Sequence, residues 1–219
     1  MIKELKFNTS KTARYYTLGT FNGDTTDIWF VFHGYGQLAK EFLSEFEVIS
    51  DRSNLIIAIE ALNRFYYRGF SGKVGASWMT KEARDDDIAD NLIFINSVFE
   101  RIISEKDRSR LKIHVLGFSQ GTHTAVRWLA SKRIPVVNLI LWSGAFPHDI
   151  NYADNSEYWS NIRTKIVLGS DDKMINQEML RSELDFLKGK NLDIELINFH
   201  GGHHLEKELL YKLNKTLNN

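Results

Sequence analysis

Short apolar runs alternate along the chain with longer segments of helical period. Most of the runs are apolar at successive positions, so both faces of each strand should be buried, as in a parallel sheet. The predicted strands are Asp27–Phe32, Leu55–Ile59, Leu111–Leu116, Val137–Trp142, Lys165–Leu168 and Ile194–Phe199. An N-terminal pair around Lys3–Phe7 and Ala13–Leu18 could add antiparallel edge strands.

The segments between these runs have the period of amphipathic helices. In the segment 83–103, Ile88, Ile95 and Phe99 share one face, and three aspartates in the first turn complement the helix dipole. Strands alternating with such helices predict an α/β fold, in which a mostly parallel sheet has helices on both faces. The predicted helices are Lys40–Ile49, Ala83–Ile103, Gln120–Ser131, Asn176–Lys188 and Leu205–Leu217.

Length and composition predict one globular domain over residues 1–219, with 43% apolar and 26% charged residues. The 28 basic residues balance 28 acidic ones, so the basic excess typical of a nucleic-acid-binding protein is missing. Cysteine is absent, which excludes disulfides, a thiolate nucleophile and cysteine-based metal sites. The N-terminus has no apolar run, and the longest apolar stretches are about five or six residues, against ~20 for a membrane span. We expect a cytoplasmic protein without an integral membrane segment.

One five-residue motif carries candidate chemistry. A predicted strand leads into Gly117-Phe118-Ser119-Gln120-Gly121, and a helical segment follows at once. A strand, G-x-S-x-G and a helix in this order are typical of a nucleophile elbow, a tight turn that exposes the serine hydroxyl and needs glycines beside it. The N–H groups after the serine then lie at a helix N-terminus, where they can stabilise an oxyanion. The simpler interpretation is an ordinary serine in a glycine turn.

This motif resembles that of the phospholipase/carboxylesterase family of α/β-hydrolases, which includes acyl-protein thioesterases. An upstream His33-Gly34-Tyr35-Gly36 after a strand and a downstream Gly201-Gly202-His203 are similar to the family's other motifs and stand in the same order. The resemblance covers about residues 27–209. It implies an α/β-hydrolase fold and a serine esterase.

A serine nucleophile needs a base that a third group orients, and in α/β-hydrolases the chain order is serine, acid, histidine. Three histidines stand together after the last predicted strand, in His200-Gly-Gly-His203-His204. The family pattern Gly-Gly-His implies His203 as the base, with His204 as the alternative. The His-x-x-His spacing could also supply metal ligands, but no acidic ligand is evident nearby. We therefore predict neither a metal site nor another cofactor.

The acid should follow the preceding strand, where two aspartates are adjacent. The spacing after Gly169 in the family implies Asp172, and Asp171 would then be a turn or capping residue. This chain lacks the prolines common after the family's aspartate, so Asp171 stays an alternative.

Two backbone N–H groups should form the oxyanion hole. One is expected from Gln120, which follows the nucleophile. By resemblance the other comes from Tyr35, in a loop whose glycines let it approach the substrate carbonyl closely. His33 is then expected to anchor this loop and not to act as the base.

The segment Asn63–Glu82 is the longest without a clear predicted element, and loops of that length are often functional. We expect it to line an apolar substrate groove, although several of its aromatic residues could instead pack the loop onto the sheet. Only about 22 residues separate the predicted strands that end at Trp142 and begin at Lys165, too few for a large cap domain. The predicted substrate-binding residues are Phe65, Tyr66, Phe70, Trp78 and Met79, and Trp78 matches a tryptophan of the family.

Together these features predict a serine hydrolase that cleaves carboxylic esters or thioesters through an acyl-enzyme on Ser119. The expected partner is a small ester or thioester with an apolar acyl group, and not a nucleic acid. Two alternatives are a catalytically silent ligand-binding protein on the same scaffold and a serine peptidase, which would normally carry a cap or propeller. The sequence leaves the oligomeric state and the acyl-chain length open.

Overall fold

The computed structural model describes residues 1–103, 110–175, 177–190 and 192–217. Its main sheet has seven strands in the order β1-β3-β2-β6-β7-β8-β9. In the described ranges β1 alone is antiparallel to its neighbour, and the other six strands are mutually parallel. The strands are β1 (Tyr15–Leu18), β2 (Asp27–Phe32), β3 (Asn54–Ile59), β6 (Lys112–Phe118), β7 (Asn138–Trp142), β8 (Arg163–Gly169) and β9 (Ile194–Phe199).

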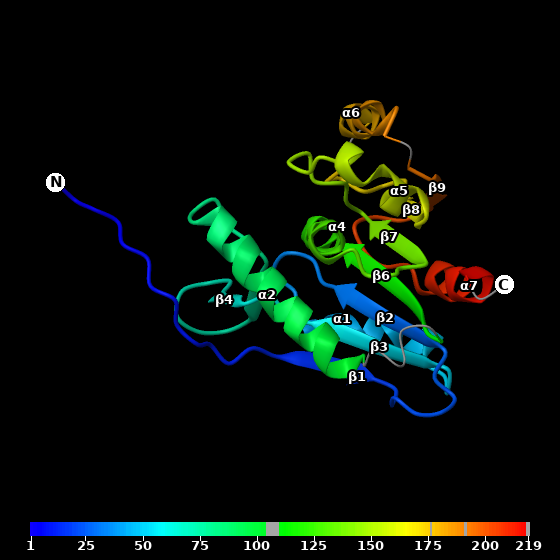
Figure 1. Ribbon diagram of the computed structural model, residues 1–219, viewed down its shortest axis with the longest axis horizontal. Coiled ribbons are helices and arrows are strands. Elements are labelled where there is room, and N and C mark those ends of the chain that lie inside the picture. Colours follow the sequence, from blue (N-terminus) through cyan, green and yellow to red (C-terminus); the bar gives the residue numbers. More distant parts are fainter. Residues whose placement is uncertain (104–109, 176, 191, 218–219) are drawn as a thin grey trace.

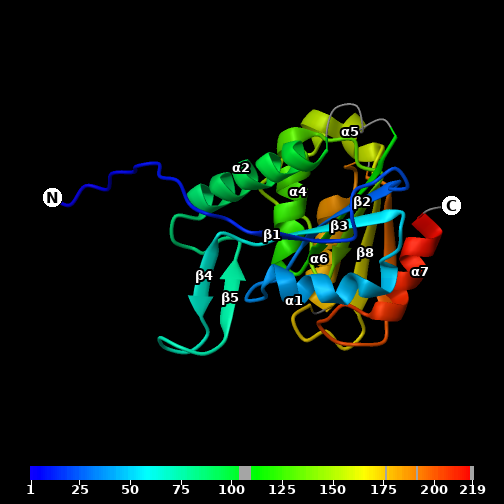
Figure 2. The ribbon, with the colours of Figure 1, turned by 90° about the horizontal axis from the view of Figure 1, so that it is seen from below.

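Helices cover both faces of this sheet (Figures 1 and 2). Every residue of β2, β3 and β7 is buried, as expected for strands without a polar face. Side chains of β2 alternate between two apolar clusters: Phe30 belongs to the cluster with α2 and α4, and Trp29 to the cluster with α1 and α7. The helices are α1 (Ala39–Leu43), α2 (Arg84–Ile102), α4 (Gln120–Lys132), α5 (Ser156–Ser160), α6 (Gln177–Leu187) and α7 (Lys207–Leu217). The predicted α/β architecture is thereby confirmed.

The structure differs from the sequence-based elements in three places. The predicted helix Lys40–Ile49 is a short α1 followed by the 3₁₀ helix η1 (Ser44–Ile49). The predicted loop Asn63–Glu82 contains a hairpin of β4 (Asn63–Tyr66) and β5 (Val74–Ser77), which projects from the main sheet (Figure 2). Residues 1–14 form no strand, and the first of them extend away from the body (Figure 1), so the expected strand around Lys3–Phe7 is wrong; Leu5 and Phe7 stay exposed. Asn176, the predicted start of one helix, lies outside the described residues.

The topology brings the candidate chemistry to one edge of the sheet. Parallel strands end at the same edge, and open α/β sheets bind ligands outside these carboxyl ends. The Ser119 turn follows β6, and Asp172 and His203 follow β8 and β9. Between β7 and β8 the chain holds only the 3₁₀ helix η2 (Ala153–Asn155) and α5, so this edge has no large cap.

Candidate active site

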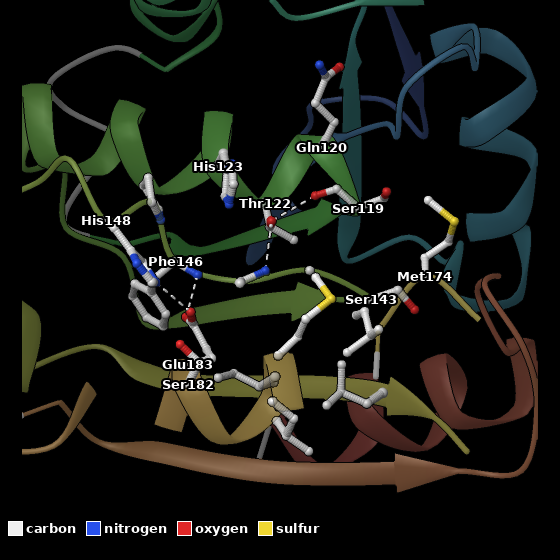
Figure 3. Close-up of a pocket in the computed structure, with 18 of the residues that line it drawn as sticks. Ser119, Gln120, Thr122, His123, Ser143, Phe146, His148, Met174, Ser182 and Glu183 are labelled. Atoms are coloured by element: carbon white, nitrogen blue, oxygen red, sulfur yellow. Dashed lines mark hydrogen bonds and ion pairs between the residues drawn. The ribbon is translucent and has the colours of Figure 1, made fainter. Parts of the chain in front are cut away.

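Ser119 occupies a strained turn between β6 and α4. Its φ of 53° and ψ of −119° lie in a region that residues with a side chain rarely adopt. Hydrogen bonds hold it there. The Ser119 amide donates to the carbonyl of Trp142 at 2.9 Å. The Thr122 hydroxyl donates to the Ser119 carbonyl at 2.8 Å (Figure 3). The result places the Ser119 side chain at the head of α4, where it lines a cavity.

The two motif glycines are required by close backbone contacts. A Cβ atom at Gly117 would lie 2.5 Å from the Cα of Thr122, and one at Gly121 would lie 2.2 Å from the carbonyl oxygen of Phe32. Both neighbours are backbone atoms that cannot move aside easily. Gly121 thereby lets the start of α4 pack against the end of β2, next to the loop that follows β2.

The predicted acid and base are in direct contact. His203 Nδ1 lies 2.8 Å from Asp172 Oδ2, and the amide of Met174 donates to Asp172 Oδ1 at 2.9 Å. The side chain of Asp172 is fully buried. Burial raises the pKa of the Asp172 carboxyl, but the bonds from His203 and Met174 and the nearby Ser143 hydroxyl outweigh it and bring the pKa below its usual value. The carboxylate is therefore ionised at neutral pH and orients the His203 ring.

The alternative residues have other surroundings. The ring of His200 lies 3.6 Å from a carboxylate oxygen of Asp171, and both side chains are largely exposed. The backbone carbonyl of His204 accepts a hydrogen bond from the Trp142 indole at 3.0 Å. Of the candidates for acid and base, His203 lines the cavity that Ser119 also lines, and Asp172 holds His203.

No hydrogen bond links the Ser119 hydroxyl to the His203 ring within the described ranges. Such bonds are often long in free enzymes and shorten when the substrate binds.

The two predicted oxyanion donors are backbone amides without a protein partner among the described residues. In the described part of the chain, the amides of Tyr35 and Gln120 donate to no protein acceptor, so both are available to a ligand. Tyr35 lies in the loop after β2, and this loop is held by the amide of Gly36, which donates to the carbonyl of Ala76 at 2.8 Å. The Gln120 side chain points away from the cavity (Figure 3) and accepts a hydrogen bond from the amide of Trp78 at 3.1 Å.

His33 anchors the base of this loop. It is completely buried; its Nδ1 lies 2.8 Å from the Gly34 carbonyl, and the Ala61 amide donates to its Nε2 at 3.1 Å. Burial lowers the pKa of His33 to about 4. The ring is therefore neutral at pH 7 and carries its proton on Nδ1, which suits an anchor and leaves no nitrogen free to act as a base.

The cavity beside Ser119 has a volume of about 870 Å³. None of the five predicted substrate-binding residues lines it, so for this cavity the sequence-based assignment is corrected. Trp78 is buried in the core, and its indole donates to the His33 carbonyl at 2.8 Å. Phe65 and Tyr66 line a separate depression, Phe70 is fully exposed near the hairpin turn, and Met79 packs against the core.

Other elements form the walls of this cavity. They are the loop 144–149 after β7, the end of β8, Met174 and Ile175, the helix α6, and one face of α4. The apolar residues among them are Ala145, Phe146, Ile166, Leu168, Met174, Ile175, Met179 and Leu180. One feature of the sequence could have indicated this wall: the amphipathic segment of α6 follows β8, the strand that pairs with β7.

Metal-binding and membrane-spanning features are missing from the part of the chain that the structure describes. No group of three or more His, Cys, Asp or Glu side chains there could hold a metal ion. No helix in these ranges is both long and apolar enough to cross a membrane.

A mostly parallel sheet with a strained serine turn after a central strand, and an Asp–His pair after the last two strands, is the architecture of the α/β-hydrolases. The family model of the Phospholipase/Carboxylesterase group matches residues 26–219, and the chain belongs to this family. Membership supports a hydrolase of the carboxylesterase or acyl-thioesterase type.

Solved structures agree with this fold. Acyl-protein thioesterase 2 from Zea mays has a TM-score of 0.71 at 15% identity, with 94% of this chain and 98% of that chain covered. A Bacillus cereus carboxylesterase has a TM-score of 0.66 at 14% identity, with 94% and 93% covered. SOBER1 from Arabidopsis thaliana has a TM-score of 0.63 at 16% identity, with 89% and 98% covered. No match was found among curated proteins.

Proposed function

We propose that this protein is a serine hydrolase that cleaves carboxylic esters or thioesters through an acyl-enzyme on Ser119. The observation that carries the proposal is the Asp172–His203 hydrogen bond of 2.8 Å, made by a histidine that lines the same cavity as a strained serine. Membership of the Phospholipase/Carboxylesterase family supports an esterase activity. The names of two structural neighbours, a carboxylesterase and an acyl-protein thioesterase, are consistent with both ester and thioester substrates.

The reaction begins when His203 Nε2 takes the Ser119 proton as Oγ attacks the substrate carbonyl. The amides of Tyr35 and Gln120 donate to the oxyanion of the tetrahedral intermediate. Asp172 stays ionised and stabilises the imidazolium. His203 then protonates the leaving alcohol or thiol, and the carbonyl–heteroatom bond breaks to give the acyl-enzyme.

A water molecule completes the cycle. His203 removes a proton from this water as it attacks the acyl-enzyme, and then returns that proton to Ser119 Oγ as the acid leaves. Only side chains and backbone amides take part, so the proposed reaction needs no cofactor.

The walls of the cavity replace the aromatic loop as the proposed substrate-binding surface. Ile166, Leu168 and Met179 offer apolar contacts along it, which favours an acyl chain over a sugar. A cytoplasmic location and a single domain stay predictions of the sequence.

The proposal is tested by treating the folded protein with a fluorophosphonate and measuring its intact mass. We expect one adduct, mapped to Ser119, that disappears in Ser119→Ala and in His203→Ala. Ser97→Ala is a matched control because Ser97 is exposed on α2, away from the cavity. No adduct on folded wild-type protein would overturn the proposal and favour a catalytically silent binding protein.

A further inference from the structure

One face of α4 lines the cavity from Ser119 to its far end. Ser119, His123 and Arg127 are four residues apart, so they share a helix face, and all three line the cavity. With a rise of about 1.5 Å per residue, His123 and Arg127 lie roughly 6 and 12 Å along the helix from the nucleophile. Figure 3 shows His123 and His148 on the opposite side of the cavity from Met174, with Ser119 nearer Met174.

Two arginines share one carboxylate at this far end. The guanidinium of Arg127, whose side chain is 7% exposed, donates to both oxygens of Asp149, at 3.0 and 3.1 Å. Arg84, from the start of α2, donates to the same carboxylate at 2.9 Å. Arg84 also contacts Asp85, but that carboxylate is 94% exposed, so water and salt screen the contact. This cluster, in which Arg127 is buried and Arg84 and Asp149 are partly exposed, thus has two positive charges and one negative charge.

Two further carboxylates line this cavity, and both belong to α6. Glu183 on α6 accepts the amide of Phe146 at 2.8 Å with one oxygen and contacts His148 Nε2 at 2.9 Å with the other. Glu178 also lines the cavity, but it is exposed on the first turn of α6. Neither carboxylate pairs with the arginines in the described ranges.

The pKa of His123 is lowered by burial and by the positive charge of Arg127. Burial lowers its pKa to about 4, and among the charged groups the largest further effect is the lowering by Arg127; Asp149 raises it, and His148 and Arg84 lower it again. His123 is therefore neutral at pH 7. Neither ring nitrogen makes a hydrogen bond to another described residue, which leaves one donor and one acceptor for a ligand in the cavity.

We propose that Arg127, Arg84 and His123 form an anion subsite, and that the enzyme prefers acyl groups that end in a carboxylate, as in monoesters or monothioesters of dicarboxylic acids. The inference rests on the proposed function. The planar fork of arginine matches a carboxylate, and the apolar residues that line the same cavity suit a chain of methylene groups.

The acyl arm is the one that points to this subsite. His203 protonates the leaving group, so the leaving group lies on the side of His203 and of Asp172, which is hydrogen-bonded to Met174. Met174 and His123 lie on opposite sides of the cavity in Figure 3. The acyl arm therefore extends along α4 toward His123 and Arg127.

The test compares two p-nitrophenyl esters with chains of equal length, the monoester of suberic acid and the octanoate. We expect wild-type kcat/KM to be about tenfold higher for the suberate, because charge-assisted hydrogen bonds contribute that much. Arg84→Met and Arg127→Met should abolish this preference, chiefly by raising KM for the suberate. Arg101→Met, at the exposed end of α2, is the matched control.

Binding to Ser119→Ala separates the subsite from catalysis. Calorimetry with the same two p-nitrophenyl esters should show that the suberate monoester binds this variant more tightly than the octanoate. The difference in affinity should shrink with added salt, and also when Arg84→Met is added to Ser119→Ala. Arg84 is suited to this because it is more exposed than Arg127, so its loss disturbs packing less.

Equal kcat/KM for the two esters, or an equal loss on both in Arg84→Met, would overturn the subsite while fluorophosphonate labelling of Ser119 left the proposed function standing. Absence of both labelling and hydrolysis would instead overturn the proposed function. In the calorimetry on Ser119→Ala, binding of the suberate monoester that is no tighter than binding of the octanoate ester would overturn the subsite, whatever the labelling shows.

Discussion

The backbone strain at Ser119 predicts an unusual order of stabilities among variants at this position. With φ at 53° and ψ at −119°, a residue with a Cβ atom is held in a conformation that glycine adopts freely. Ser119→Ala keeps the Cβ atom and hence the strain. Ser119→Gly removes both, so we expect the glycine variant to be more stable than the alanine variant.

The expected difference follows from two opposing effects. Strain of this kind costs roughly 1–3 kcal/mol. Glycine in turn increases the conformational entropy of the unfolded chain, which costs about 0.4–1 kcal/mol. The net expectation is a free energy of unfolding about 1 kcal/mol higher for Ser119→Gly than for Ser119→Ala, or a Tm higher by about 2–4 °C in a chain of this size.

Urea denaturation and calorimetry on the two variants measure this difference, with Ser97 as the matched control. Ser97 is exposed in the interior of α2, where glycine is about 1 kcal/mol less favourable than alanine. The order of the two variants should therefore reverse between positions 119 and 97. Equal stabilities, or alanine above glycine at position 119, would refute the idea that strain is stored at the nucleophile.

Two further predictions concern the acid and the loop anchor. Asp172→Asn should lower kcat by about 10⁴-fold because His203 loses its orienting carboxylate. Asp171 is exposed, so Asp171→Asn should change ester hydrolysis less than about twofold. The reverse ranking of the two variants would assign the acid to Asp171. His33, with a pKa lowered from 6.5 to about 4, binds a proton in the unfolded chain before it does so in the folded one. The free energy of unfolding should thus fall by about 3 kcal/mol as the pH drops from 6.5 toward 4. Urea denaturation at several pH values measures this fall, and His33→Asn should make it smaller. The same dependence of the unfolding free energy on pH in His33→Asn would contradict a neutral buried ring.

The aromatic segment 63–82 shows where sequence reasoning reached its limit. Its aromatic content indicated a groove, but content does not say which way a ring points. Trp78 turns into the core and donates to the His33 carbonyl, whereas Phe70 points to solvent near the hairpin turn. The walls of the cavity beside Ser119 come instead from the loop after β7 and from α6, which are far from Ser119 in sequence.

The sequence by itself determined the local features of this protein. Runs apolar on both faces specify buried parallel strands, and the glycines around Ser119 specify a tight turn, because both depend on neighbours within a few residues. The candidate serine, aspartate and histidine were chosen by the chain order of α/β-hydrolases, and in the structure each of them follows its own strand.

Only the tertiary structure decided what these features face. The choice between Asp171 and Asp172 depends on a 2.8 Å contact with His203 across 31 residues. The meeting of Arg84, Arg127 and Asp149 depends on how α2 and α4 pack, and it sets the charge at the end of the cavity. Such contacts are set by packing between distant elements, and no local pattern in the chain encodes them.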